Sequence, residues 1–130
     1  MAYLLDAGTL VEVLRAVPSR TLIRRLTSVP SRDRWTSSIA VSQILVAARR
    51  TGSQKLMKDV IRLVAAIKVA SFDMLSAQAF AKLRATVAAD IDTDDVMIAA
   101  IAVTNDFTLV TRRPSDFARY PGLRIEDWTA

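Results

Sequence analysis

The stretch Tyr3-Leu4-Leu5-Asp6 decides the fold, because it places a carboxylate directly after a short apolar run. A run of this kind is typical of a short buried strand. A carboxylate at the end of such a strand is costly unless it is paired or bound to a cation. Two later acids, Asp95 and Asp116, also lie beside apolar segments. Together the three acids predict a metal site.

The composition limits both the number of domains and the available chemistry. A chain of 130 residues, 52% apolar and 24% charged, predicts a single globular domain over residues 1–130. The sequence contains no Cys and no His, which excludes thiolate and imidazole groups as ligands or catalysts. Any metal must therefore be held by oxygen atoms, and such sites favour Mg²⁺ or Mn²⁺.

The sequence carries no signal for a membrane segment or for export. No uncharged apolar stretch approaches the roughly 18 residues of a membrane span, and no basic leader precedes Asp6. We therefore expect a cytoplasmic protein that does not enter a membrane. The formal net charge is +5, supplied mostly by Arg, which suits planar contacts with the phosphates of RNA. Ordinary solubility explains the same charge equally well.

Short apolar runs alternate with segments of helical periodicity. We expect strands over residues 3–5, 35–38, 68–71, 108–111 and 123–125, with helices between them and with Thr9 and Ser76 as helix caps. This alternation predicts a three-layer α/β/α sandwich around a short, mainly parallel sheet. Ligands gather at the carboxyl ends of such strands, where Asp6 is placed. An all-helical architecture is the rival interpretation, because the strands are short.

Several segments resemble the PIN-domain ribonucleases, and specifically the VapC-like toxins of bacterial and archaeal toxin–antitoxin pairs. The resemblance covers nearly the whole chain and implies a PIN-like fold. It rests on Leu4-Leu5-Asp6 with Leu10 and Glu12 following, Ser38 to Ile44, Asp95 to Ala100, Leu109 to Arg112 leading to Asp116-Phe117, and the ending from Tyr120 to Trp128.

The resemblance also implies which residues hold the metal. In that family the first Asp, a Glu on the third helix and the Asp before Ile-Ala-Ala form the metal-binding cluster, with a fourth acid or Asn after the last strand. Asp6 and Asp95 match two of these positions and are the expected catalytic ligands. Gln43 stands at the Glu position and would offer a neutral carbonyl oxygen. Asp116 is the remaining acid, three residues beyond the matching position.

Three positions depart from the family pattern. Gln43 stands in place of Glu and removes one full negative charge. The turn that is usually Asp-Thr-Asn is Asp6-Ala7-Gly8 here, and Arg113 replaces the Asn of the usual Thr-Arg-Asn segment. With Arg112, Arg113 is a candidate for binding substrate; it would either clamp a phosphate or substitute electrostatically for a missing ion.

The missing Glu has candidate replacements elsewhere in the chain. Glu12, Asp92 and Asp94 are the available candidates for the absent acid, and Glu12 and Asp94 are kept as secondary candidates. Asp94 is adjacent to Asp95, and neighbouring residues at a helix start point in different directions, so both would reach one ion only from a distorted first turn.

The resemblance implies a Mg²⁺- or Mn²⁺-dependent endoribonuclease that hydrolyses phosphodiester bonds in RNA. Its expected partners are RNA, a cognate VapB-like antitoxin bound by the early helices, and a second copy of the chain in a homodimer. Apolar residues outside the main helix stripes, such as Val11 and Ile61, would suit a partner, although core packing explains them as well. The alternative function is a catalytically degenerate PIN domain that binds RNA or an antitoxin without cleavage.

Basic residues precede and follow the predicted third helix. If they cluster around the carboxylates, they would offer phosphate contacts on both sides of the pocket, whereas a solvated helix face is the alternative. They are Arg20, Arg24, Arg25, Arg32, Arg34, Arg49, Arg50, Lys55 and Lys58.

Overall fold

Five short strands form one sheet in the computed structural model, which describes residues 1–130. They are β1 (Tyr3–Leu5), β2 (Arg34–Ser37), β3 (Lys68–Ala70), β4 (Thr108–Val110) and β5 (Arg124–Glu126). The strand order is β3-β2-β1-β4-β5, and every neighbouring pair is parallel. The predicted parallel sheet is therefore confirmed. Since β1 is central, its carboxyl end lies in the middle of one edge of the sheet.

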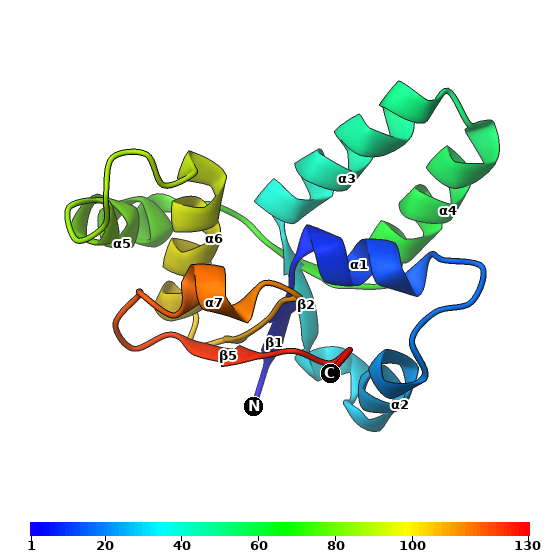
Figure 1. Ribbon diagram of the computed structural model, residues 1–130, viewed down its shortest axis with the longest axis horizontal. Helices are drawn as coiled ribbons and strands as arrows, with labels where there is room; N and C mark the ends of the chain where they lie inside the picture. Colours follow the sequence, from blue (N-terminus) through cyan, green and yellow to red (C-terminus); the bar gives the residue numbers. More distant parts are fainter.

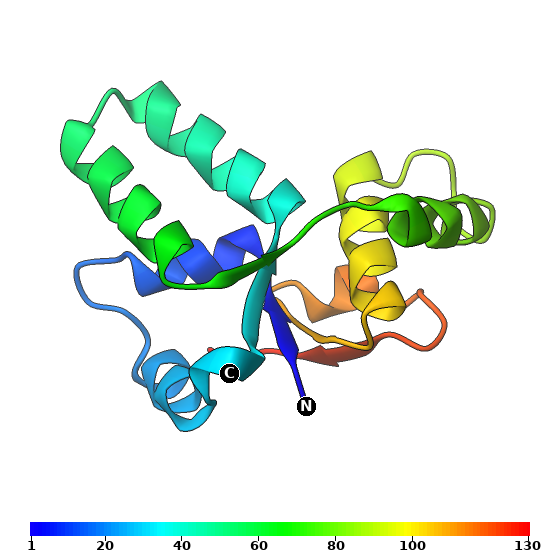
Figure 2. The ribbon, with the colours of Figure 1, turned by 180° about the vertical axis from the view of Figure 1, so that it is seen from behind.

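Helices cover both faces of this sheet. They are α1 (Ala7–Val13), α2 (Arg20–Ser28), α3 (Ser38–Thr51), α4 (Gln54–Ala65), α5 (Met74–Arg84), α6 (Thr93–Thr104) and α7 (Pro114–Phe117), with a 3₁₀ turn over Ser31–Asp33. Figure 1 shows α3 and α4 as a hairpin on one side of the strands and α5 and α6 on the other, and Figure 2 shows the same division from behind. The all-helical interpretation is wrong. No helix in the structure has the length and apolar character that a membrane span requires.

The alternation of side chains along the strands creates two cores. In β1, Leu4 packs with the α6 residues Val96 and Ile101, whereas the next residue, Leu5, packs with Leu10 of α1 and Ile44 of α3. Successive side chains of a strand point to opposite faces of the sheet, so one strand can contribute side chains to the cores on both faces. This arrangement is the predicted three-layer sandwich, in which the two leucines of the central strand are buried on opposite faces.

Helix α6 is buried on almost every side. Ile98 and the small residues Ala99, Ala100 and Ala102 are fully or almost fully inaccessible to solvent. Alanines permit close approach of the neighbouring α5 and of the sheet, which explains why this helix shows apolar residues without a polar face. The close packing fixes the position of the first turn of α6, which carries Asp95.

The two predicted helix caps are wrong. The N-cap of α1 is Asp6, whose Oδ1 accepts a hydrogen bond from the Thr9 backbone N–H at 2.9 Å. The N-cap of α5 is Asp73, which accepts from the Ser76 N–H at 2.9 Å. In both cases a carboxylate three residues upstream satisfies the free N–H groups, so the helix begins earlier than the hydroxyl residue.

Candidate acidic site at the carboxyl edge of the sheet

Asp6 is held at the end of β1 by contacts on three sides. Its backbone N–H donates to the Val110 carbonyl of β4 at 3.0 Å, and its Oδ1 caps α1. The Thr9 hydroxyl donates to the same Val110 carbonyl at 3.2 Å, which ties α1 to β4. The side chain is buried, with 4% of the residue exposed, yet Oδ2 has no hydrogen-bond partner in the protein. Asp6 therefore offers one oxygen for a ligand.

Asp95 is paired with Arg113 through both of its oxygens. Arg113 follows β4, and its Nη1 and Nη2 donate to Oδ2 and Oδ1 of Asp95 at 3.1 and 3.0 Å. Asp95 is 7% exposed, so the carboxylate of this fork-shaped pair is largely removed from water, whereas 48% of the Arg113 side chain is exposed. Arg113 Nη1 also donates to Asp116 Oδ2 at 3.1 Å, in the short helix α7. One guanidinium therefore joins two of the three acids among the predicted metal ligands.

The charge of Asp6 acts on the same guanidinium. The hydrogen bonds that Arg113 donates to Asp95 are the main cause that raises the pKa of Arg113, and the charges of Asp95 and Asp6 and the hydrogen bond to Asp116 raise it further. Arg113 thus stays charged at any pH at which the protein folds. The structure brings Asp6, Asp95 and Asp116 around Arg113, and it contains no group of three or more acidic side chains positioned to hold a metal by themselves.

Gln43 faces Asp94 across the interface between α3 and α6. Its Nε2 donates to Asp94 Oδ2 at 3.1 Å, while the Asp94 backbone N–H donates to Asp92 Oδ1 at 3.0 Å. Asp94 and Asp95 thus engage different partners, as expected for adjacent residues in the first turn of a helix. The carbonyl oxygen of Gln43 has no hydrogen-bond partner in the protein. That oxygen is the one polar atom which Gln43 leaves open to a ligand.

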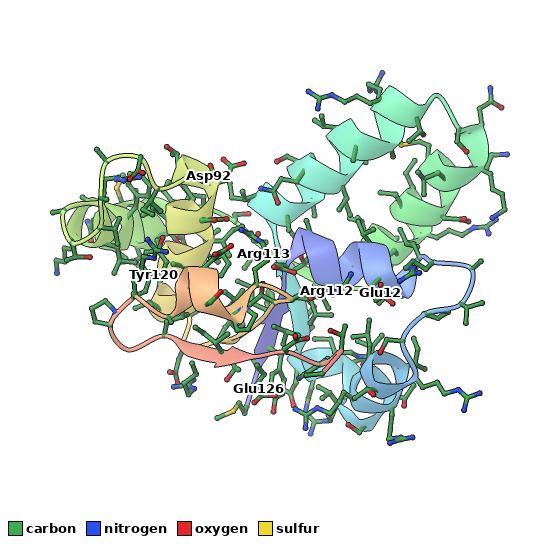
Figure 3. All side chains as sticks on the ribbon, in the orientation of Figure 1. Glu12, Asp92, Arg112, Arg113, Tyr120 and Glu126 are labelled. Atoms are coloured by element: carbon green, nitrogen blue, oxygen red, sulfur yellow. The ribbon has the colours of Figure 1, made fainter.

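Glu12 forms a separate ionic cluster. Its carboxylate accepts hydrogen bonds from Arg15 Nη1 at 3.1 Å, from the Ser19 N–H at 3.1 Å and from Arg112 Nη1 at 3.3 Å. Figure 3 shows Glu12 and Arg112 close together and apart from Asp92 at the start of α6. Only 4% of Glu12 is exposed, and the hydrogen bond from Arg15 is the main cause that lowers its pKa. Glu12 is thus fully engaged with cations of the protein, and Arg112 is tied to it.

The predicted basic residues do not all surround the pocket. Tyr3, the first residue of β1, pairs in parallel with Arg34, the first residue of β2. Arg34 and the preceding Arg32 therefore lie at the amino end of the strands, opposite Asp6. Arg25 is occupied elsewhere, since it pairs with Glu126 and its guanidinium lies 5.2 Å from the ring centre of Trp128. The expectation of basic residues on both sides of the pocket is wrong for these three.

Comparison with known proteins agrees with this geometry. A match to the family described as "PIN domain" covers residues 3–123. The chain is 25% identical to the tRNA(fMet)-specific endonuclease VapC of Salmonella typhimurium, over 98% of each protein. Its fold is similar to DNA-bound VapBC from Salmonella typhimurium, with 25% identity, 98% of each chain covered and a TM-score of 0.88. It is also similar to VapBC-1 from nontypeable Haemophilus influenzae, with 23% identity, all of each chain covered and a TM-score of 0.85. The match over residues 3–123 shows that this chain belongs to the PIN-domain family.

Proposed function

We propose that this protein is a metal-dependent endoribonuclease of the VapC type. The observation that carries the proposal is the placement of two buried carboxylates, Asp6 and Asp95, at one edge of a parallel sheet, where Asp95 pairs with the guanidinium of Arg113 and the charge of Asp6 acts on the same guanidinium. Active sites of open parallel sheets lie at this edge. The similar VapC of Salmonella typhimurium is a tRNA(fMet)-specific endonuclease, which supports RNA as the substrate class.

The donor atoms at this edge fit Mg²⁺ or Mn²⁺ by their chemistry. These ions prefer oxygen ligands, and Mg²⁺ is usually held by one or two carboxylates together with water. Asp6 and Asp95 would hold the ion, with Asp116 and the Gln43 carbonyl as further proposed ligands. When bound, such an ion lowers the pKa of a water molecule and stabilises charge on a phosphodiester. Arg113, whose side chain is 48% exposed, would contact the substrate phosphate.

An antitoxin and a second copy of the chain are the proposed protein partners. The two similar structures named above are of VapBC, which supports a VapB-like antitoxin. A pocket of about 230 Å³ lies between α1, α3 and α4, and it is lined mainly by apolar side chains that include Val11, Ile44 and Val60. Val11 is 48% exposed, so this pocket opens to solvent beside an apolar surface.

A second candidate function is a PIN domain that binds RNA or an antitoxin without cleavage. The observation that favours it is the low negative charge of the pocket. Gln43 donates an amide hydrogen bond to Asp94 where a carboxylate is expected, and Arg113 neutralises Asp95. Losing one carboxylate ligand weakens metal binding by about ten-fold or more, on the order of 1.4 kcal/mol.

The first prediction tests the nuclease. With millimolar Mn²⁺, we expect the wild-type protein to cleave RNA, and we expect Asp6→Asn or Asp95→Asn to lower the rate by about 100-fold or more, because a carboxylate ligand of the proposed metal ion is lost. Cleavage of labelled RNA followed on a gel measures the rate, and calorimetry with Mn²⁺ measures binding.

The matched control for this prediction is Asp59→Asn, which removes a carboxylate that pairs with Lys55 on the surface of α4. This variant should retain the wild-type rate. Circular dichroism establishes that all variants fold. A wild-type protein that neither binds Mn²⁺ nor cleaves RNA at millimolar metal would contradict the proposal.

A further inference from the structure

Arg113 occupies the position at which a divalent ion would meet Asp95. Both oxygens of Asp95 accept from its guanidinium, at 3.0 and 3.1 Å. A carboxylate engaged in this bidentate way has its strongest hydrogen-bonding directions filled. An ion that binds Asp95 through these directions displaces the guanidinium, and an ion beside it would be repelled by its positive charge, so the two cations compete for Asp95.

The guanidinium also supplies the positive charge that this group of acids requires. Asp6 and Asp95 are buried, and Asp116 shares Arg113 Nη1 with Asp95. Carboxylates brought close together repel one another unless a cation or a proton neutralises them. Removing one partner from a buried ion pair is strongly destabilising, because the remaining charge is left uncompensated. Arg113 thus stabilises the pocket without any metal.

The backbone on either side of Arg113 holds the residue in place while leaving its side chain partly free. The Arg113 N–H donates to the Thr111 hydroxyl at 3.0 Å, and its carbonyl accepts from the Asp116 N–H at 3.1 Å. The guanidinium carbon lies 5.3 Å from the ring centre of Phe117, which is fully buried. Because 48% of the side chain is exposed, the guanidinium has an open path to solvent. Figure 3 shows Arg113 in the centre of the molecule, among α1, α6 and α7.

From these contacts we propose that Arg113 is a built-in competitor for the divalent ion, an autoinhibitory contact that closes the pocket until metal displaces it from Asp95. The inference rests on the proposed metal site at Asp6 and Asp95. The pocket then has two states, one with Arg113 on Asp95 and one with the ion there. Its apparent metal affinity is the intrinsic affinity reduced by the fraction of molecules in which Asp95 is free.

The second prediction tests this competition by calorimetry with Mn²⁺. Arg113→Asn leaves both Asp95 oxygens free, so we expect it to bind Mn²⁺ about ten-fold more tightly than the wild-type protein, and Arg113→Ala, which introduces no oxygen ligand of its own, should show the same gain. Arg112→Asn is the matched control, because it removes the same charge from the adjacent residue, which pairs with Glu12 instead of Asp95. We expect its Mn²⁺ affinity to stay within about three-fold of wild type. Equal or weaker binding by Arg113→Asn would overturn the proposal.

Thermal unfolding provides a second readout that needs no RNA. In EDTA, Arg113→Asn should unfold at a lower temperature than the wild type, and millimolar Mn²⁺ should raise its Tm by more than it raises the wild-type Tm. If Arg113 had only a structural role, Arg113→Asn would have a lower Tm in EDTA, but Mn²⁺ would raise its Tm no more than it raises the wild-type Tm. That result would contradict the competition. Arg113→Lys keeps the positive charge but not the two parallel hydrogen bonds, so its Mn²⁺ affinity should lie between those of the wild type and Arg113→Asn.

These measurements separate the inference from the nuclease proposal. If the wild type fails to cleave RNA while Arg113→Asn binds Mn²⁺ more tightly, the competition holds and the nuclease proposal fails. If the wild type cleaves RNA while Arg113→Asn gains no affinity, the nuclease holds and the competition fails. Absence of Mn²⁺ binding by both proteins would overturn the competition outright.

Discussion

At the scale of single residues, the site shows two ways to keep a carboxylate buried. Asp95 is neutralised by the one guanidinium of Arg113. Glu12 is instead shared among Arg15, Arg112 and the Ser19 N–H, so its charge is spread over three donors from two distant segments. Each of these donors stabilises the ionised form of the carboxyl group. The Glu12 cluster therefore stabilises the chain just after α1 without taking part in the pocket.

The third prediction concerns the pH dependence of stability. The pKa of Glu12 lies below its ordinary value of 4.5 in the folded protein, mainly because Arg15 donates a hydrogen bond to it. Folding therefore favours the charged form, and this stabilisation is present above pH 4.5 and is lost as the pH falls through the lower folded pKa. We expect Glu12→Gln to be less stable than wild type at neutral pH, and the difference between them to shrink as the pH falls below 4.5.

Thermal unfolding at a series of pH values checks this expectation. Asp59→Asn serves as the control, since Lys55 is its only ion-pair partner and lies on the exposed surface. A Tm difference between Glu12→Gln and wild type that stays constant down to about pH 3 would refute the assigned role of Glu12.

At the scale of elements, a single polar contact bridges the two helical layers. The bond from Gln43 to Asp94 joins α3, which packs on one core, to the first turn of α6, which packs on the other. The amide can donate to a carboxylate in the absence of any cation, whereas a Glu at this position would repel it. Gln43 thus allows α3 and the first turn of α6 to contact each other without a bound metal ion.

The fourth prediction is the outcome of Gln43→Glu. Without metal we expect a lower Tm than in wild type, because the introduced carboxylate would replace a hydrogen bond to Asp94 with repulsion. With Mn²⁺ we expect binding about ten-fold tighter, because the pocket gains a carboxylate ligand. A gain of RNA cleavage would indicate that the natural chain is degenerate, and an unchanged rate would argue against degeneration. Gln78→Glu, on the exposed side of α5, is the matched control for added charge.

At the scale of the whole molecule, the basic residues are only partly located around the pocket. The net charge of +5 favours long-range attraction of polyanions. Arg32 and Arg34 lie at the end of the sheet opposite Asp6, and Arg25 pairs with Glu126. The two arginines that follow β4 are already paired, Arg112 with Glu12 and Arg113 with Asp95 and Asp116.

The fifth prediction is a moderate salt dependence of RNA binding. We expect the affinity to fall by about ten-fold between roughly 50 and 200 mM salt, as for a protein that contacts a few phosphates of a single strand. Fluorescence anisotropy with labelled RNA and the Asp95→Asn variant measures binding in the absence of cleavage. An affinity that does not change with salt would contradict an electrostatic contact with RNA.

Much of the fold could be predicted because the apolar patterns of single segments and the alternation of strands with helices indicate the same architecture. The apolar run before Asp6 and the β-branched run over residues 108–111 both form central strands. The place of Asp6 follows from the parallel arrangement, since the carboxyl ends of parallel strands meet, and Asp95 lies at the same edge because α6, which leads into β4, begins there. The expectation for Arg32 and Arg34 failed, although the direction of β2 already determines their place at the opposite end.

The contacts within the pocket could not be predicted, because they depend on side-chain direction across long separations. Arg113 and Asp95 are 18 positions apart and come from different elements. Spacing does not show which way either side chain points, nor that the guanidinium reaches both oxygens. The caps of α1 and α5 failed for a local reason, since an upstream Asp accepts from the N–H groups of Thr9 and Ser76 and so starts each helix three residues earlier.

The opposite orientations of Leu4 and Leu5 also control the precision of the site. Because a strand has a two-residue period, a slip of β1 by one position would exchange the two cores and turn Asp6 to the other face. Neither layer of helices tolerates that exchange, since each is packed around its own leucine. The packing of Leu4 and Leu5 therefore determines the position of Asp6. Substitutions far from the pocket that loosen either core should displace this carboxylate.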